Sequence, residues 1–320
     1  MNEDSIIGFL KNAFPQSIGD DAAVLSQHAG EEIVISKDLL VEDVHFRRRY
    51  QTPDSLARKA LAVNLSDIAA MGATPFAVFL GLSASSDDRA FVDAFLNAFV
   101  DACRDAKVIL MGGDTTGAPS NQLYLSITIL GRGKSDTLKY RHTAQVGDVL
   151  YIAGPLGKAH RGFTALERNL PGFEADKAHF LNPRARVAEG LWLANQPGVH
   201  AMMDLSDGLW VDLHKLIQAS QCSATISIEK IYPTEIELSV YQALGLAPVE
   251  TQLTGGEDYA LLFSVAPEKA PLLSAKFEFE FSYPLLEIGE ITASKGRHRV
   301  ELFEKNKTVS LILQSFNHFD

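Results

Sequence analysis

Residues 53–73 read PDSLARKALAVNLSDIAAMGA, and this stretch carries the clearest structural pattern in the chain. Pro53 and Asp54 open a predicted helix that runs through Met71, with Asp54 as the expected N-cap. Apolar side chains recur on most sides of this helix, which predicts that it is largely buried.

The same helix carries polar side chains at positions expected to be buried. At helical spacing, Asn64 and Asp67 share a stripe with Ala60 and Met71. A buried carboxylate costs several kcal/mol unless it is paired or bound to a metal ion. A surface stripe or an internal hydrogen bond would also explain the pattern, but we expect a functional role for Asp67.

Working outward from this helix, short acidic motifs recur along most of the chain. We expect those beside glycines, at the end of an apolar run, to lie where a strand stops and a loop begins, so that several could converge at one site. Packed carboxylates stay ionised when cations lie between them, and hard divalent cations commonly carry phosphate. The motifs are GDDAA at 19–23, SKDLL at 36–40, NLSD at 64–67, GGDTT at 112–116, DLSDG at 204–208 and GGED at 255–258.

Each motif also has an ordinary structural explanation. Asp21 fits an Asx turn, and Asp38 fits a cap at the end of a strand. Ser206 or Asp207 could cap the helix that follows it, and residues 255–258 could form a bulged hairpin or approach a ligand closely. The repetition of one chemistry in six places favours a shared site.

Composition limits the function further. The chain has 320 residues and a net charge of -11, with 46% hydrophobic and 22% charged residues. These values predict a soluble protein of two domains and argue against nucleic acid as a partner. No apolar run approaches the ~20 residues needed to span a membrane. Cys103 and Cys222 form no zinc or disulfide pattern, so we expect a cytoplasmic protein.

Strand and helix patterns alternate in both halves, which predicts an α/β (α+β) fold. Residues 91–103 are predicted to form an amphipathic helix, and further helices are expected from Pro183 through Ala194 and over 209–219. Short strands are expected near 32–36, 108–111, 123–130 and 149–153. The polar segment 131–147 suggests a domain boundary. We therefore expect domains at 1–138 and 139–320.

Several catalytic motifs are absent from the sequence. It contains no P-loop, no protein-kinase catalytic motif and no Gly-x-Ser-x-Gly turn. The histidines show no metal-ligand spacing, and only His45, within VEDVHF at 41–46, is retained as a candidate.

The order, identity and spacing of these motifs resemble thiamine-monophosphate kinase. The resemblance extends from Gly19 to residues 316–319 and is most specific at 62–73 and 204–209. This family belongs to the superfamily of aminoimidazole ribonucleotide synthetase and selenophosphate synthetase.

The resemblance implies two domains with mixed sheets, helices on one face of each sheet, and a homodimer formed through the N-terminal domains. It implies ATP-dependent phosphorylation of thiamine monophosphate to thiamine diphosphate, by direct in-line transfer with several Mg²⁺ ions. The implied metal ligands are Asp21, Ser36, Asp38, Asp67, Asp114, Asp204 and Asp207, of which Asp67 and Asp207 would be catalytic. The implied nucleotide contacts are Gly113, Asp114, Arg141 and Ser206, and the implied thiamine monophosphate contacts are His45, Glu257 and Phe316.

Four positions depart from the family pattern. Lys37 stands where Thr is usual beside a metal-binding Asp, and its ammonium cannot ligate Mg²⁺. Asp43 replaces a small residue, while Leu313 and Ser315 replace Trp and Gly near the aromatic C-terminal end.

Three other functions remain open at this point. The chain could be another superfamily enzyme, although it lacks the reactive N-terminal Cys of selenophosphate synthetase and the C-terminal Cys of hydrogenase-maturation relatives. It could be a Mg²⁺- or Ca²⁺-binding interaction module, although it has no EF-hand spacing. It could also be a metal-dependent phosphatase.

Overall fold

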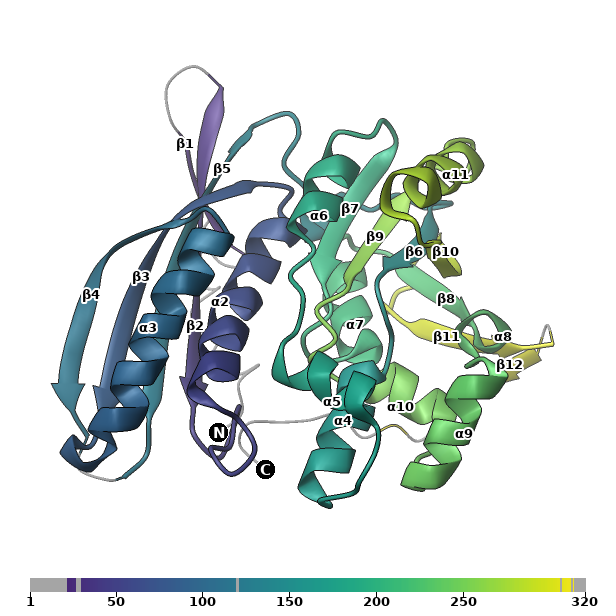
Figure 1. Cartoon of the computed structure of the whole chain (residues 1–320). Coiled ribbons are helices and arrows are strands. Elements are labelled where there is room, and N and C mark those ends of the chain that lie inside the picture. Colours follow the sequence, from purple (N-terminus) through teal and green to yellow (C-terminus); the bar gives the residue numbers. More distant parts are fainter. Residues whose placement is uncertain (1–21, 27–29, 119–120, 306, 312, 314–320) are drawn as a thin grey trace.

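The computed structural model divides the chain into two sheets, each covered by helices (Figure 1). It describes residues 22–26, 30–118, 121–305, 307–311 and 313. The first sheet uses residues between 23 and 134, and the second uses residues between 149 and 309. The predicted mixed α/β architecture is confirmed.

The first sheet has five strands in the order β1-β2-β5-β3-β4. Its strands are β1 (Ala23–Ser26), β2 (Glu31–Val41), β3 (Thr74–Ala84), β4 (Ile109–Gly117) and β5 (Tyr124–Lys134). Strands β3 and β4 pair in parallel, and the other neighbours pair antiparallel. The sheet is therefore mixed.

Two helices cover one face of this sheet, α2 (Pro53–Ala70) and α3 (Arg89–Asp105) (Figure 1). They bury the side chains that alternate toward them from the strands, such as Val34, Ile127 and Ile129, together with Phe95 and Phe99 of α3. A short 3₁₀ turn at Ser86–Asp88 precedes α3. No helix of the described residues covers the opposite face, which we call the open face.

The second sheet has seven strands in the order β12-β11-β8-β10-β6-β9-β7. Its strands are β6 (Val149–Ala153), β7 (Val199–Asp204), β8 (Ser223–Ser227), β9 (Leu261–Val265), β10 (Leu286–Thr292), β11 (Val300–Glu304) and β12 (Lys307–Val309). The accompanying helices are α4 (Lys158–Glu167), α5 (Glu174–Leu181), α6 (Val187–Ala194), α7 (Leu209–Ala219), α8 (Ile228–Ile231), α9 (Glu235–Leu244), α10 (Pro248–Thr254) and α11 (Ala270–Phe281). Two hydrophobic clusters fill the space between this sheet and its helices.

Helix α2 joins the two halves. It packs against its own sheet on one side and against α6 and β7 on the other (Figure 1). The crossing with α6 is close because Gly190 of α6 has no side chain. A Cβ at this position would lie 2.2 Å from the carbonyl oxygen of Ala69. Because both sides are covered, 13 of its 18 residues are buried, as the sequence predicted.

Some local predictions were wrong. Thr52, rather than Asp54, caps α2 by accepting a hydrogen bond from the N–H of Ser55. Strands β2 and β4 continue through Asp38 and Asp114, so these carboxylates do not mark strand ends. The ladder with β5 keeps β2 extended along its whole length, and that pairing partner is not visible in the local sequence.

Other boundaries were closer to the prediction. Helix α3 and strand β6 occupy the expected segments, and α7 matches the prediction at both ends. Helix α6 begins at Val187 instead of Pro183. Among the described helices, none is both long enough and apolar enough to cross a membrane.

Candidate active site

The first part of the site lies where β2 meets α2. The Ser36 hydroxyl, which is buried on β2, donates a short hydrogen bond to Oδ2 of Asp67 on α2. Asp38 follows two residues later and therefore points to the same face of the sheet. Burial raises the pKa of Asp38 to about 6, so its carboxylate lacks the solvation that normally stabilises its charge.

The second part joins α2 to the other half of the chain. The buried Ser66 hydroxyl donates a hydrogen bond of 2.7 Å to Oδ2 of Asp204, which is also buried. Asp204 is the last residue of β7. One turn of α2 therefore contacts two sequence-predicted positions, Ser36 from the first sheet and Asp204 from the second.

Tyr259 shows that these carboxylates converge. Burial raises the pKa of its phenol well above the usual value near 10, and negative charge from nearby carboxylates raises it further. Those carboxylates belong to Glu257, Asp38, Asp204 and Asp67. Four acidic side chains, separated by as many as 219 positions in the sequence, therefore act on one hydroxyl group.

Backbone hydrogen bonds tie together the two loops of the second half. The N–H of Glu257 donates to the carbonyl of Ser206 (2.8 Å), and the N–H of Tyr259 donates to that of Leu205 (2.9 Å). A Cβ at Gly256 would lie 2.6 Å from the carbonyl oxygen of Ser206. The backbone at residues 255–258 therefore packs closely against the 205–208 turn, and the bulged hairpin that was the alternative explanation does not form.

The 205–208 turn is held by an aspartate that we had not singled out. Buried Asp212 accepts hydrogen bonds from the N–H groups of Ser206 and Asp207, both 3.0 Å. Lys215 pairs with both Asp207 and Asp212. Neither Ser206 nor Asp207 caps α7, whose N-cap is Gly208, so the capping explanation for this motif was wrong.

The structure does not bring Asp114 to this group within one chain. Asp114 lies on the exposed edge strand β4, three strands from β2, a separation of about 14 Å. Its register with Gly81, and that of Gly81 with Ser126, place Asp114 on the open face of the sheet. Gly113 precedes it on the same edge strand.

Lys37 also lies on the open face. Its ammonium donates to the hydroxyl of Ser126 at 2.6 Å, whereas Ser36 and Asp38 point toward α2. Because side chains alternate along a strand, Lys37 does not lie between the carboxylates of this chain. The presence of Lys37, where the family pattern has Thr, therefore leaves the group around Tyr259 intact.

Of the remaining sequence candidates, the structure describes His45 and Arg141. His45 occupies the turn after β2, where its Nδ1 accepts the N–H of Val41 at 3.0 Å. Arg141 begins the 3₁₀ turn Arg141–Thr143, and its carbonyl accepts a hydrogen bond from Ser220 of the turn after α7. Asp21 and Phe316, as well as Ser315, lie outside the described residues.

The donor chemistry of this group fits a hard divalent cation. Carboxylate and hydroxyl oxygens are the ligands that Mg²⁺ prefers, and the desolvated Asp38 would gain from a neighbouring positive charge. Within the described ranges, which leave out Asp21, no three His, Cys, Asp or Glu side chains already surround one metal position.

Sequence reasoning missed four residues that hold the site together. They are Lys59, Ser66, Asp212 and Tyr259. Ser66 had a visible signal, because it lies inside the NLSD motif, but we considered only the stripe of Asn64 and Asp67. Asn64 does make the internal hydrogen bond that the sequence allowed as an alternative, from its amide to the carbonyl of Ala60.

Comparison with known protein families assigns this architecture to a class. The family model described as AIR synthase related protein, N-terminal domain, matches residues 19–133, and the corresponding C-terminal domain model matches residues 145–301. The fold and the site therefore define a two-domain protein of the AIR synthase related class.

Comparison with individual relatives identifies the family within this class. Thiamine-monophosphate kinase of Haemophilus influenzae is 33% identical over 310 residues, covering 95% of this chain and 91% of that protein. The Escherichia coli K12 thiamine-monophosphate kinase is also 33% identical, covering 94% and 91%. The solved complex of AaThiL with AMPPCP and TMP has a TM-score of 0.84 at 28% identity and covers 99% of this chain and 97% of that one. The chain belongs to the thiamine-monophosphate kinase family.

Proposed function

We propose that this protein transfers the γ-phosphoryl group of ATP to thiamine monophosphate and so forms thiamine diphosphate. The observation that carries the proposal is that α2 joins carboxylates from both halves of the chain, because Asp67 bonds to Ser36, Ser66 bonds to Asp204 and Lys59 pairs with Glu257. Family membership supports the choice of substrates, because relatives that match over nearly the whole chain are thiamine-monophosphate kinases.

The acceptor in this reaction is a phosphate oxygen that is already ionised near neutral pH. It needs no strong general base, which agrees with the lack of a catalytic histidine motif in the sequence. The chain must instead bring two anions into line and balance their charge. We assign direct in-line transfer without a phosphoenzyme, with Asp67 and Asp207 as the catalytic residues.

The proposed ligands of Mg²⁺ are Asp21, Ser36, Asp38, Asp67, Asp114, Asp204 and Asp207. When bound, Mg²⁺ would supply the positive charge that allows the phosphate groups of both substrates to approach each other. The hydrogen bonds from Ser36 to Asp67 and from Ser66 to Asp204 would orient the ligand carboxylates.

The substrate contacts are assigned as the family resemblance implies them. Gly113, Asp114, Arg141 and Ser206 are the proposed nucleotide contacts, and His45, Glu257 and Phe316 are the proposed contacts to thiamine monophosphate. Gly113 and Asp114 lie on the edge strand β4, and Asp114 is on the open face. Within one chain they are separate from the group around Tyr259, so their assignment depends on the proposed homodimer.

The proposed homodimer forms through the N-terminal domains, 1–138, with 139–320 as the second domain. Support comes from apolar side chains on and beside β4, where Ile109 and Met111 are 63% and 60% exposed. Leu39 on the open face is 60% exposed as well. Burying such side chains against a second copy would be favourable. We propose the cytoplasm as the compartment, where ATP is available and both cysteines can stay free.

The decisive test uses the full-length protein with ATP, Mg²⁺ and thiamine monophosphate, and detects thiamine diphosphate by mass spectrometry. We expect equimolar ADP and thiamine diphosphate. Release of inorganic phosphate without the acceptor would indicate a phosphatase, and metal binding without ATP turnover would indicate an interaction module. Aminoimidazole ribonucleotide synthetase substrates serve as a second panel, in which we expect no turnover.

A further inference from the structure

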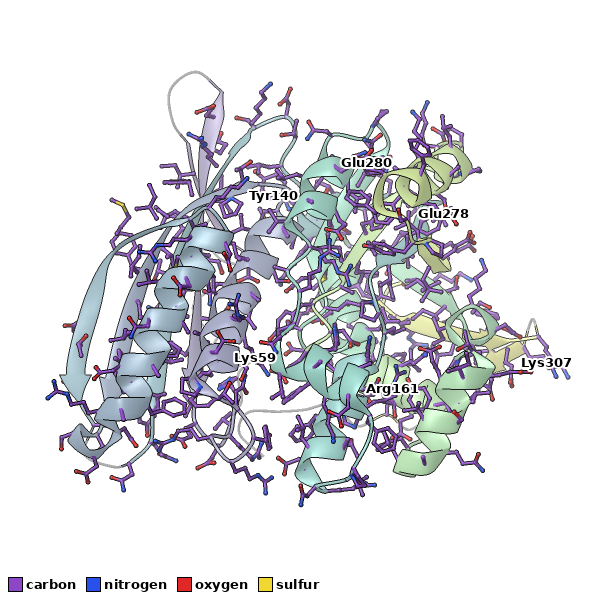
Figure 2. The ribbon with its side chains drawn as sticks, viewed as in Figure 1. Lys59, Tyr140, Arg161, Glu278, Glu280 and Lys307 are labelled. Atoms are coloured by element: carbon purple, nitrogen blue, oxygen red, sulfur yellow. The ribbon has the colours of Figure 1, made fainter. Side chains whose placement is uncertain are left out.

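Lys59 of α2 carries a charged group in an unusual place. Its side chain is 1% exposed, in the middle of a helix that both halves of the protein cover. A buried ammonium is unfavourable unless a counter-charge and hydrogen-bond acceptors surround it. Figure 2 shows Lys59 on α2 between the two halves of the molecule.

Two groups from the second half provide this environment. Oε1 of Glu257 lies 3.0 Å from the ammonium nitrogen, and the ring of Phe180 on α5 lies 3.9 Å from it to the centroid. An ammonium has three N–H donors. Among the residues that the structure describes, none of these donors has hydrogen-bond geometry, and Glu257 is the only anionic partner of the ammonium, so the two charges depend on each other.

Glu257 is held in a special backbone conformation. Its φ is 65°, in the left-handed region that a residue with a side chain seldom adopts, and its N–H is bonded to the carbonyl of Ser206. Such conformations persist where the surrounding structure enforces them and often mark functional sites. The Glu257 side chain is 29% exposed, so it is accessible on one side while Lys59 lies behind it.

The surrounding charge explains what Lys59 contributes. Glu257 acts on Tyr259 together with Asp38, Asp67 and Asp204, so without a cation it would be repelled by the other carboxylates. Lys59 balances that repulsion from the buried side and fixes the position of Oε1.

We propose that Lys59 is a positioning residue that holds Glu257 for recognition of the organic part of the phosphorylated acceptor. This inference rests on the proposed function. A carboxylate repels a phosphate, so its partner on thiamine monophosphate is the positively charged thiazolium ring or the amino group of the pyrimidine. Lys59 itself does not contact the substrate, and it acts through Glu257.

The test compares steady-state kinetics of Lys59→Met, Glu257→Gln and the double variant, with Lys177→Met as control. Lys177 is a largely buried lysine of the neighbouring helix α5, and it donates to the carbonyl of Leu170. We expect each single variant to raise the KM for thiamine monophosphate about tenfold and to change the KM for ATP less than twofold. We expect the double variant to match the single variants, because both remove the same interaction. Lys177→Met should leave both KM values unchanged.

Several results would overturn the proposal. One is a Lys59→Met protein that melts at a lower temperature but keeps the wild-type KM, since Lys59 would then be only structural. Another is a double variant whose KM rises by the product of the single effects. If Lys59→Met does not fold, Glu257→Asp serves instead, because its shorter side chain moves the carboxylate away from the substrate. An unchanged KM for thiamine monophosphate in that variant would also contradict the proposal. Product formation by the wild-type protein tests the proposed function separately, whereas a wild-type KM in Glu257→Gln would contradict only the roles of Glu257 and Lys59.

Discussion

Ser66 of α2 and Asp204 of β7 are joined by a hydrogen bond of 2.7 Å that crosses between the two halves of the chain, and both side chains are buried. Removing the hydroxyl with Ser66→Ala would leave one oxygen of Asp204 without this donor. Because an unsatisfied buried acceptor costs about 1–3 kcal/mol, we expect a lower free energy of unfolding. We also expect kcat to fall about tenfold, because Asp204 would lose its orientation.

The matched control for this prediction is Ser264→Ala. The buried Ser264 hydroxyl donates to the buried Asp148 at 2.8 Å, within the second half of the chain and outside the group around Tyr259. Chemical denaturation should show a comparable loss of stability in both variants. An equal loss of kcat in both would mean that Ser66 has no special role in the site.

Asp67→Asn tests the carboxylate at the centre of the proposed mechanism. The amide keeps the shape and can still contact Ser36, but it loses the negative charge. We expect kcat to fall by about 10²- to 10³-fold with little change in the melting temperature. Phosphoryl transfer is measured by a coupled ADP assay, with Asp101→Asn on the exposed face of α3 as control. Near-wild-type turnover in folded Asp67→Asn would contradict the catalytic assignment.

Asp38 should make stability depend on pH in the absence of Mg²⁺. Burial raises its pKa from 3.8 to about 6, so the folded protein holds this proton more tightly than the unfolded chain does. The free energy of unfolding therefore contains a contribution that decreases as pH rises from about 4 to about 6. We expect Asp38→Asn to remove this decrease and to be more stable than the parent by about 2 kcal/mol at pH 8.

Thermal unfolding in EDTA at several pH values measures this difference. At pH values below about 4 both side chains are neutral, so the two proteins should melt at similar temperatures. Asp136→Asn, in an exposed turn, serves as control and should follow the parent at every pH. A stabilisation of Asp38→Asn that does not change with pH would show that its cause is not the buried charge.

The proposed homodimer can be tested at β4. Met111 is 60% exposed on this edge strand, and Met111→Glu would place a charge in an apolar contact. We expect the mass in light scattering after gel filtration to fall from that of a dimer to that of a single chain. Ile236→Glu, on α9 and 81% exposed, should leave the mass unchanged. A wild-type protein that is already monomeric would contradict the proposal.

The sequence predicted correctly those helices whose own residues carry a clear apolar pattern. The amphipathic spacing of residues 91–103 gave α3, and the apolar surroundings of α2 correctly indicated that it is buried. Prediction was less accurate where long-range pairing decides the structure. Asp38 lies within a strand because β2 pairs with β5 along its whole length. Helices α5, α8, α9, α10 and α11 were not predicted, since their patterns are short or irregular.

The sequence by itself determined that this chain is a two-domain protein rich in acidic motifs and a member of the thiamine-monophosphate kinase family. Motif identity and order are enough for that, because they are local properties. Only the tertiary structure decided which of the acidic side chains meet. It gathers Asp38, Asp67, Asp204 and Glu257 around Tyr259 and turns Asp114 to the other face of its sheet. Strand register and the packing of α2 between both halves set these positions, and neither can be read from the order of residues.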